Sequence, residues 1–315
     1  MLAEPLISIV LPNYNRRDLL PDAVASVRQQ TYTRWELVIA DDGSTDDGLA
    51  TLPADKRIRV IRLPHTGNVA SVRNVALREA AGVLVGFLDS DDRWRPEKLV
   101  RQIARLLARP ECGWCYGQHD LIDERGATVP FRASSPWQPR EGAFIREMLT
   151  TEAGVALQTV IVRRDIAAAI RFDERIPYAD DYDFLVRLAF VTMACAVDEV
   201  VADIREHAGR TTHQRYDQTL GIAMTYRSYR RLVTDPALKR VCTRRSVAQI
   251  RSYLSRARAA GELGHGLANV IRAWMGVHDA AKPCPEAEQS DADQAGSNAG
   301  QSRFEIAGVK RRGKT

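Results

Sequence analysis

Three carboxylates within four positions follow an apolar run in the stretch FLDSDDRW. They are Asp89, Asp91 and Asp92, and the next basic residue is Arg93. Like charges at this spacing repel one another, and a bound divalent cation offsets that repulsion. Mg²⁺ and Mn²⁺ prefer oxygen ligands and often complete their coordination with water and substrate phosphates. The pattern therefore predicts a cation and diphosphate site, while the plain alternative is an acidic strand end with Asp92 as a helix cap.

Two more polar clusters each follow a short apolar run. PNYNR follows LISIVL, and DDGSTDD follows ELVIA. Tyr14 in the first cluster has a ring that can stack on a nucleobase, and Arg16 lies nearby. Asp41 and Asp42 in the second can accept hydrogen bonds from a base or from ribose hydroxyls. Arg73 follows further along the chain, where a guanidinium can reach a phosphate. Together these residues predict a site for a nucleoside diphosphate.

The elements that must position these clusters alternate between strands and helices. The expected strands are 6–11, 36–40, 57–63 and 83–88, and the expected helices include 68–81 and one opened by Pro96. This alternation indicates an α/β fold with a mainly parallel, Rossmann-like central sheet flanked by helices. Ligands of such sheets bind outside the carboxyl ends of the strands, so the three clusters should surround one crevice.

The second half of the chain is less regular. Residues 119–143 are rich in Pro, Gly and charge and are expected to form loops around the site. A strand is expected at 157–162 and a helix at 181–190. The acids that open this helix, in ADDYDF, suit a helix N-terminus because the helix dipole favours negative charge there. That structural explanation competes with a catalytic one.

Composition sets the protein class. The 315 residues are 45% hydrophobic and 27% charged, which is typical of a globular protein with a sizeable core. No stretch is long and apolar enough for a membrane span, and MLAEPLISIVLP does not resemble a signal peptide, so we expect a cytoplasmic protein. The five cysteines include the pair Cys112 and Cys115. Without a second pair for zinc, we expect these two to be buried apolar side chains beside Trp114.

Positive charge is concentrated in one segment. From Arg205 to Arg258 there are thirteen Lys or Arg and three Asp or Glu, whereas the whole chain has a net charge of +5. Residues 216–280 are expected to form an Arg-rich helical extension, and 281–315 a disordered tail. The basic segment suits an anionic acceptor or a membrane surface, or it is a solvated helical face. Nucleic acid is not expected, because no aromatic platform or known binding motif accompanies the charge.

Four ordered motifs now carry a family resemblance. SIVLPNYNRRDLL, WELVIADDGSTDD, SVRNVALREAAGVLVGFLDSDDRWRPEKL and ADDYDFLVRL resemble the successive motifs of family 2 glycosyltransferases, which are inverting enzymes with a GT-A fold. The resemblance spans about residues 6–215, with a nucleotide-binding half at about 1–110 and an acceptor half at about 111–215. It implies a nucleoside-diphosphate sugar as donor, Mn²⁺ or Mg²⁺ as cofactor, and sugar transfer with inversion.

The resemblance also implies roles for individual residues. The nucleotide pocket would be lined by Pro12, Tyr14 and Arg16, and the base would be contacted by Asp42 with Asp41. Arg73 would belong to the donor site. Asp91 would bind the metal, and Asp89 would contact the ribose or the metal's waters. Inverting transfer needs one general base. The family places it second in a Glu-Asp pair, which is Asp180-Asp181 here, so Asp181 would be the base and Asp180 would lie on the acceptor side. His207 would be a third metal ligand or would touch phosphate.

The resulting hypothesis is a metal-dependent glycosyltransferase of polysaccharide or glycoconjugate synthesis. Its acceptor would be a sugar or a lipid-linked glycan, with peripheral contact at the inner face of the membrane. A sugar nucleotidyltransferase is one alternative, although PNYNRRDLL lacks the Gly-rich loop of that class. A non-catalytic protein that binds nucleotide sugars is another.

Overall fold

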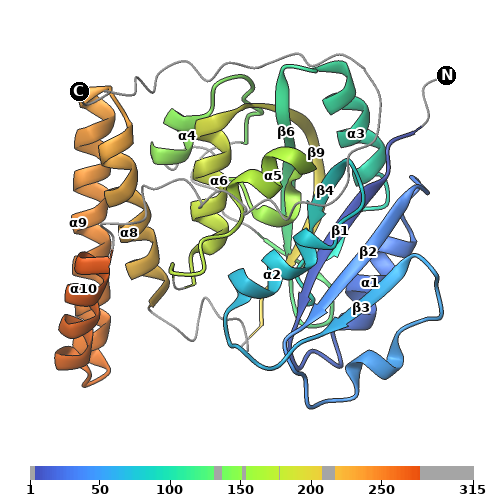
Figure 1. The fold of residues 1–315 in the computed structure, drawn as a ribbon, viewed down its shortest axis with the longest axis horizontal. Helices are drawn as coiled ribbons and strands as arrows, with labels where there is room; N and C mark the ends of the chain where they lie inside the picture. Colours follow the sequence, from blue (N-terminus) through green and yellow to red (C-terminus); the bar gives the residue numbers. More distant parts are fainter. Residues whose placement is uncertain (1–3, 131–136, 151–153, 177, 208–216, 277–315) are drawn as a thin grey trace, which may run out of the picture. The chain divides into compact units, whose positions relative to one another are not determined.

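The computed structural model describes residues 4–130, 137–150, 154–176, 178–207 and 217–276. Its first third alternates strands and helices (Figure 1). These elements are β1 (Ile7–Asn13), α1 (Leu20–Arg28), β2 (Trp35–Asp41), β3 (Ile58–Arg62), α2 (Val69–Arg78), β4 (Leu84–Phe87), β5 (Arg93–Trp94) and α3 (Lys98–Ala108). The strands expected from the sequence are therefore present, and β1 continues through Pro12 instead of ending before it.

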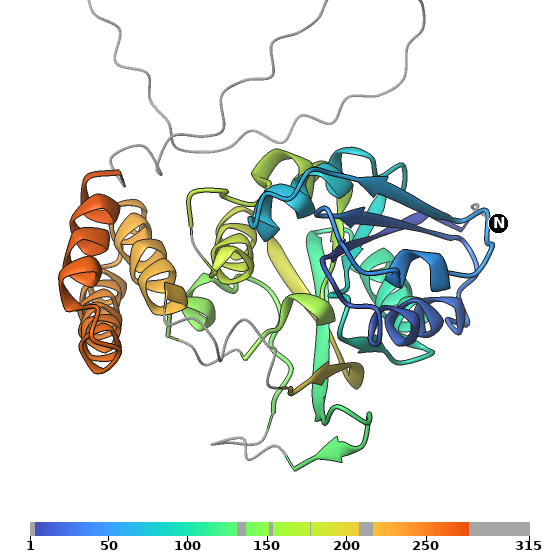
Figure 2. The ribbon, with the colours of Figure 1, turned by 90° about the horizontal axis from the view of Figure 1, so that it is seen from below.

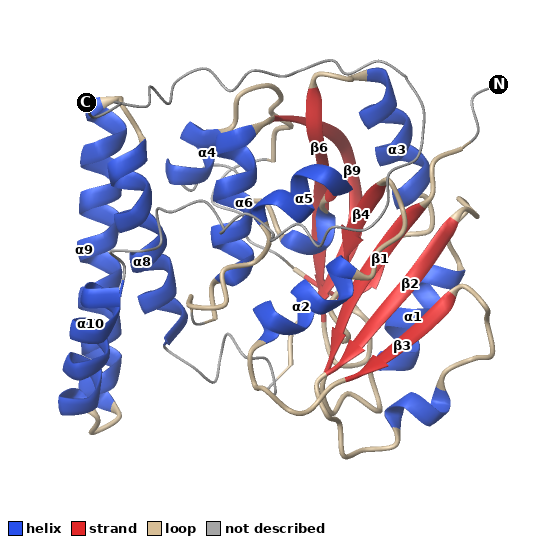
Figure 3. Ribbon diagram, in the orientation of Figure 1, coloured by secondary structure: helices blue, strands red, loops and turns tan. Residues whose placement is uncertain are grey.

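The rest of the chain adds more strands and a helical C-terminal part (Figure 3). The elements are β6 (Cys112–Ile122), β7 (Thr128–Val129), α4 (Ile145–Thr150), β8 (Ile161–Arg163), α5 (Arg164–Ile170), α6 (Asp180–Val191), β9 (Met193–Arg205), α8 (Asp217–Leu232), α9 (Pro236–Ala259) and α10 (Leu263–Gly276). The expected helices of the extension are present. The tail at 281–315 lies outside the described residues.

Within the described residues nine strands form one sheet, in the order β3-β2-β1-β4-β8-β6-β9-β5, with β7 paired to β6. The first four strands are parallel, as predicted. The other half is mixed: β8 is antiparallel to β4 and β6, whereas β6 and β9 are parallel. The α/β class is therefore confirmed, but the description of the sheet as mainly parallel holds only for its N-terminal half.

Two local expectations were wrong. The strand expected at 157–162 is a short 3₁₀ helix, Leu157–Thr159, followed by β8. The loop expected from 119 begins only after Ile122, because β6 runs to that residue and pairs with β9 along its length. A strand as short as β8 leaves little periodic signal in a sequence.

Helices cover both faces of the sheet (Figure 2). Alternate residues of β1 point to opposite faces, so Ile9 packs with α1 and α3 while Val10 packs with α2 and α6. Cys112 and Cys115 are buried free thiols on the α1 and α3 side, as the sequence predicted. Among the described helices none is both long and apolar enough to cross a membrane.

Candidate active site

A cleft of about 950 Å³ opens beside the carboxyl ends of the parallel strands. All three polar clusters contribute to its lining, with Tyr14, Asp42 and Asp91 as examples, and α6 contributes Asp180 and Asp181. A volume of this size is at the upper end of the range for small-molecule and cofactor sites. The fold thus brings Pro12 and Asp181, which are 169 positions apart in the sequence, to the same cleft.

Asp41 shapes the cleft without lining it. Its side chain is buried at the tip of β2, with the residue only 2% exposed. Asp41 Oδ1 accepts hydrogen bonds from Asn13 Nδ2 at 2.7 Å and Ser44 Oγ at 2.6 Å, and Oδ2 accepts one from the Ser44 backbone N–H at 3.0 Å. These bonds join the loops that follow β1 and β2. Asp41 therefore fixes these two loops relative to each other, and its contact with the nucleotide stays a prediction.

Asp42 lines the cleft and holds the loop that follows β3. Its carboxylate accepts hydrogen bonds from the backbone N–H groups of Thr66 at 2.8 Å and Gly67 at 2.9 Å. Gly43 makes this approach feasible, because it has a φ of +72° and an added Cβ would lie 2.8 Å from the backbone nitrogen of His65. The DDGS motif therefore forms a turn that packs directly on the loop following β3.

His65 is a site residue that the sequence analysis missed. Its ring stacks on Tyr14, with ring centroids 4.2 Å apart and an interplanar angle of 18°. Its Nδ1 lies 3.0 Å from Asp42 Oδ2. Both rings line the cleft, as Pro12 and Arg16 do. The signal was available, because His65 follows the carboxyl end of a parallel strand in the same way as the three clusters did.

Arg73 bridges two acids of the cleft. Its Nη2 donates to Asp89 Oδ1 at 2.7 Å, and its Nη1 donates to Asp180 Oδ2 at 2.6 Å. Asp89 Oδ2 accepts a further hydrogen bond from Gln158 Nε2 at 2.6 Å. Arg73 is buried, and the two carboxylates hold the pKa of its guanidinium above the usual value although burial opposes this. Arg73 also lines the cleft, and its contact with a donor phosphate stays a prediction.

Asp91 and His207 are in contact although 116 positions separate them in the sequence. His207 Nε2 lies 3.0 Å from Asp91 Oδ2, and Arg16 Nε lies 3.6 Å from the same oxygen. Burial alone would raise the pKa of Asp91, but the hydrogen bond to His207 and the charge of Arg16 outweigh it and lower that pKa. Asp91 is therefore held as a carboxylate beside an imidazole. This is the pairing that the family resemblance implied for a metal site.

Arg205, the last residue of β9, fixes this arrangement. Its backbone N–H donates to Asp92 Oδ1 at 2.8 Å, and its Nε donates to the Asp91 carbonyl at 2.8 Å. Its Nη2 also donates to Asp22 Oδ2. Because Arg205 is buried and precedes His207 by two positions, it ties the acidic loop to the segment that carries the imidazole. Asp92 is thus structural, as expected, although its partner is a strand end instead of a helix.

Asp181 lines the cleft at the start of α6. Burial and the neighbouring carboxylate of Asp180 raise its pKa to about 6, although the positive charge of Arg73 opposes the shift. Its Oδ1 accepts a hydrogen bond from the Tyr182 backbone N–H at 2.7 Å. A carboxylate with a pKa close to neutral is suited to general base catalysis, because it is ionised at working pH and still takes up a proton effectively.

The donor set around Asp91 fits a divalent cation. Carboxylate oxygens suit both Mn²⁺ and Mg²⁺, and an imidazole nitrogen favours a transition metal such as Mn²⁺ over Mg²⁺. In the described ranges no group of three or more His, Cys, Asp or Glu is arranged to hold a metal by itself. Water and a phosphorylated substrate would complete the coordination.

Comparisons with known proteins agree with this geometry. The profile described as "Glycosyl transferase family 2" matches residues 8–167. A relative from Bacillus subtilis, whose name assigns it to teichuronic acid biosynthesis as the glycosyltransferase TuaG, is 39% identical over 130 residues, which are 40% of this chain and 51% of that protein. This chain thus spans about half the length of that relative. The Escherichia coli protein WfaP, named UDP-Glc:alpha-D-GlcNAc-diphosphoundecaprenol beta-1,3-glucosyltransferase, is 30% identical over 220 residues, covering 68% of this chain and 83% of WfaP.

Solved structures share the fold. Residues 1–349 of Staphylococcus aureus TarS in complex with UDP-GlcNAc give a TM-score of 0.61 at 20% identity, over 88% of this chain and 83% of that one. The mannosyltransferase PcManGT of Pyrobaculum calidifontis, in complex with GDP-Man and Mn²⁺, gives a TM-score of 0.58 at 19% identity, over 88% and 84% of the two chains. At these identities the likeness establishes the GT-A fold.

Proposed function

Because this chain belongs to glycosyl transferase family 2, we propose that it transfers a sugar from a nucleoside-diphosphate sugar to an acceptor hydroxyl, with inversion at the anomeric carbon. It is a glycosyltransferase with a GT-A fold. Family membership favours this reaction over the nucleotidyl transfer and the non-catalytic binding considered from the sequence. In this scheme the nucleotide-binding half is about residues 1–110 and the acceptor half about 111–215, followed by the helical extension at 216–280.

The observation that carries the proposal is the buried bridge through Arg73. It joins Asp89 of the acidic motif to Asp180, the immediate neighbour of the expected base Asp181. The acids on the donor side and those at the start of α6 therefore have fixed positions relative to one another within one cleft. Inverting transfer requires this, because the base must lie on the opposite side of the anomeric carbon from the leaving diphosphate.

The proposed chemistry at Asp181 is a single displacement. The acceptor oxygen forms a bond to the anomeric carbon while the bond from that carbon to the diphosphate oxygen breaks. The acceptor's hydroxyl proton passes to the Asp181 carboxylate, and the nucleoside diphosphate leaves with its negative charge. The pKa of Asp181, about 6, keeps the carboxylate ionised at neutral pH and makes it a stronger base than an ordinary aspartate.

We assign a divalent cation, Mn²⁺ or Mg²⁺, to Asp91 and His207. When bound, it would neutralise charge on the leaving diphosphate. Asp91→Ala should abolish Mn²⁺-dependent binding of UDP in calorimetry, because it removes the only carboxylate in contact with His207 among the described residues. Asp47→Ala, at an exposed position of the neighbouring loop, is a matched control that should bind normally. Undiminished Mn²⁺-dependent binding by Asp91→Ala would refute the assignment.

The donor pocket follows from the Tyr14 and His65 pair. We propose that the nucleobase stacks on these rings, that the Asp42 loop contacts it, and that Pro12 and Arg16 line its path to the diphosphate. Asp89 would face the ribose, since Arg73 and Gln158 hold it at the cleft wall. A UDP-sugar is the donor we propose, on the basis of the UDP-Glc named for WfaP.

The proposed acceptor is a lipid-linked glycan, since the name of WfaP gives that relative a diphosphoundecaprenol-linked GlcNAc as acceptor. A protein that uses such an acceptor would act at the inner, cytoplasmic face of the membrane. The test is an assay of the purified chain with UDP-Glc, UDP-GlcNAc and GDP-Man, each with Mn²⁺. Release of a nucleoside diphosphate that increases with a diphosphoundecaprenol-linked sugar supports the proposal. Release of pyrophosphate from nucleoside triphosphates, or no turnover of any donor, would contradict it.

A further inference from the structure

Helix α9 has an unusual charge. Its residues 236–259 include seven Lys or Arg and no Asp or Glu. Five of its arginines are exposed, namely Arg256 and a set of four, Arg240, Arg244, Arg251 and Arg258. Their spacing of 4, 7 and 7 residues places them on one face of the helix, because seven residues make almost two full turns. The stripe is about 27 Å long at 1.5 Å per residue.

Among the residues that the structure describes, these four arginines have no acidic partners. No ion pair within the described ranges involves any of them, although many arginines of the glycosyltransferase domain are paired. A solvated helix face usually alternates positive and negative charges, because unlike charges four residues apart stabilise the helix and like charges destabilise it. Arg240 and Arg244 are such a like-charged pair. The stripe therefore has a composition that helix stability does not explain.

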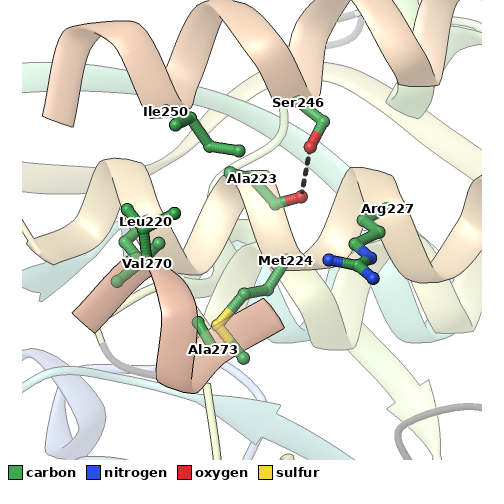
Figure 4. Close-up of a pocket in the computed structure, with 8 residues that line it drawn as sticks. All are labelled: Leu220, Ala223, Met224, Arg227, Ser246, Ile250, Val270 and Ala273. Carbon is green, nitrogen blue, oxygen red and sulfur yellow. Dashed lines mark hydrogen bonds between the residues drawn. The ribbon is translucent and has the colours of Figure 1, made fainter. Parts of the chain in front are cut away.

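The stripe is on the outer side of the helix. The opposite face of α9 packs inward, where Cys242, Ser246 and Tyr253 are buried against α8 and α10. A cavity of about 10 Å³ among the three helices has room for about one water (Figure 4). Ser246 Oγ donates to the Ala223 carbonyl at 3.0 Å beside this cavity. The helices are thus fully packed on one another, and the arginines point away from that contact.

Helix α10 adds an exposed aliphatic ridge. Leu263, Leu267 and Ile271 are spaced four residues apart, and the last two are 46% and 56% exposed. On α9, Val247 is 42% exposed and lies within the arginine stripe. The inner face of α10 contacts α9 through Gly266 against Ala257. The α9–α10 pair therefore presents both arginines and large apolar side chains to its surroundings.

We propose that the outer surface of the α9–α10 pair, consisting of the arginine stripe and the aliphatic ridge, docks onto an anionic phospholipid bilayer. Clustered arginines are attracted to anionic headgroups, and exposed leucine and isoleucine side chains enter the boundary between headgroups and acyl chains. A soluble polyanion would match the arginines but would leave the aliphatic ridge in water. A second copy would place like charges opposite each other. The surface thus fits a membrane better than either.

Flotation with vesicles tests this surface without donor or acceptor. The full chain should bind vesicles of phosphatidylcholine with about 30% phosphatidylglycerol far better than vesicles of pure phosphatidylcholine. Salt at about 1 M should weaken this binding. The triple variant Arg244→Gln, Arg251→Gln, Arg258→Gln should bind roughly 100-fold more weakly. Leu267→Asn with Ile271→Asn should also weaken binding, mainly the part that survives high salt.

Matched variants separate the effect of the arginine stripe from the effect of net positive charge. Arg34→Gln, Lys56→Gln, Arg78→Gln removes the same charge from exposed positions elsewhere and should bind like the wild type. Triple Arg→Lys at 244, 251 and 258 should retain most of the binding and shows whether the fold tolerates change there. Equal binding by the glutamine triple and the wild type would overturn the proposal, as would binding of DNA or a soluble acidic polysaccharide without vesicle binding. Neither outcome would affect the proposed sugar transfer, which is assayed on its own.

Discussion

Arg73 Nη1 lies 2.6 Å from Asp180 Oδ2, and this contact links α2 to the start of α6. The same guanidinium holds Asp89. A buried arginine between two carboxylates leaves uncompensated charge if it is removed, which costs about 3–5 kcal/mol in comparable sites. The bridge therefore makes the geometry of the cleft depend on one side chain that contacts neither the proposed base nor the proposed metal ligand directly.

Arg73→Gln should lower the free energy of unfolding by about 3 kcal/mol and the transfer rate by at least about 100-fold, because the acids it holds would repel and move apart. Urea unfolding and a transfer assay measure the two effects. Arg78→Gln, at an exposed position of the same helix, should change neither. A variant at Arg73 with normal turnover would show that the bridge does not organise the site.

Activity should depend on pH through Asp181. The proposed base must be ionised, and burial with the Asp180 charge raises its pKa to about 6. The logarithm of kcat/KM should therefore rise with a slope of one as pH increases to about 6 and level off above it. A profile that stays flat down to pH 4 would contradict the role of a carboxylate with a raised pKa.

At neutral pH the charged Asp181 should also reduce the free energy of unfolding. Its folded-state pKa of about 6 exceeds the ordinary value of 3.8, so the folded protein binds a proton between these pH values that the unfolded chain does not. Stability from this group is present below pH 4 and is lost as pH rises through 6. Asp181→Asn should consequently stabilise the protein at pH 7.5, by up to about 3 kcal/mol, and have little effect at pH 4. Asp165→Asn, in the exposed first turn of α5, is the control in urea unfolding, and an unchanged or lowered stability at pH 7.5 would refute the raised pKa.

A second titration involves Lys98, which is buried away from the cleft. Its Nζ donates to Gln102 Oε1 at 2.6 Å and lies 4.7 Å from the centroid of the Trp94 ring. Burial lowers its pKa to about 7. Between pH 7 and 10.5 the unfolded chain holds a proton that the folded protein lacks, so stability should rise with pH in this window.

Lys98→Met should therefore stabilise the protein at pH 7 and lose this advantage by pH 10.5. The shift corresponds to at most about 5 kcal/mol, and loss of the Gln102 hydrogen bond and the Trp94 contact offsets part of it. Unfolding midpoints of the two proteins at pH 7, 8.5 and 10 give the comparison. A difference that does not shrink with rising pH would mean that the lysine is charged in the folded protein.

The sequence predicted the parallel half of the fold because buried parallel strands are short apolar runs whose polar ends stand out. It also indicated the cleft, since PNYNR, DDGSTDD and DSDDRW all follow such strands. It could not predict the bridge by Arg73, because a buried ion pair between α2 and α6 depends on packing across more than 100 residues. For the same reason it did not predict the hydrogen bonds that Arg73 and Asp41 make with neighbouring side chains.

The remaining gaps have similar physical causes. Gln158 holds Asp89 from a short 3₁₀ helix whose residues carry no periodic signal. Arg205 holds the acidic loop from the end of β9, a strand that pairs with β6 through several register shifts. The sequence did indicate His207, but only through the family resemblance, and its contact with Asp91 is visible only in the folded chain.

The most direct test of the account compares transfer and donor binding in Asp181→Asn. The substitution removes the proposed base and keeps the size of the side chain. Transfer, measured with the donor found in the screen, should fall by at least about 1000-fold, while the Kd for the nucleoside diphosphate with Mn²⁺ should stay within about twofold of the wild type. Retained transfer, or a loss of nucleotide binding as large as the loss of transfer, would contradict the assignment of Asp181 as the general base.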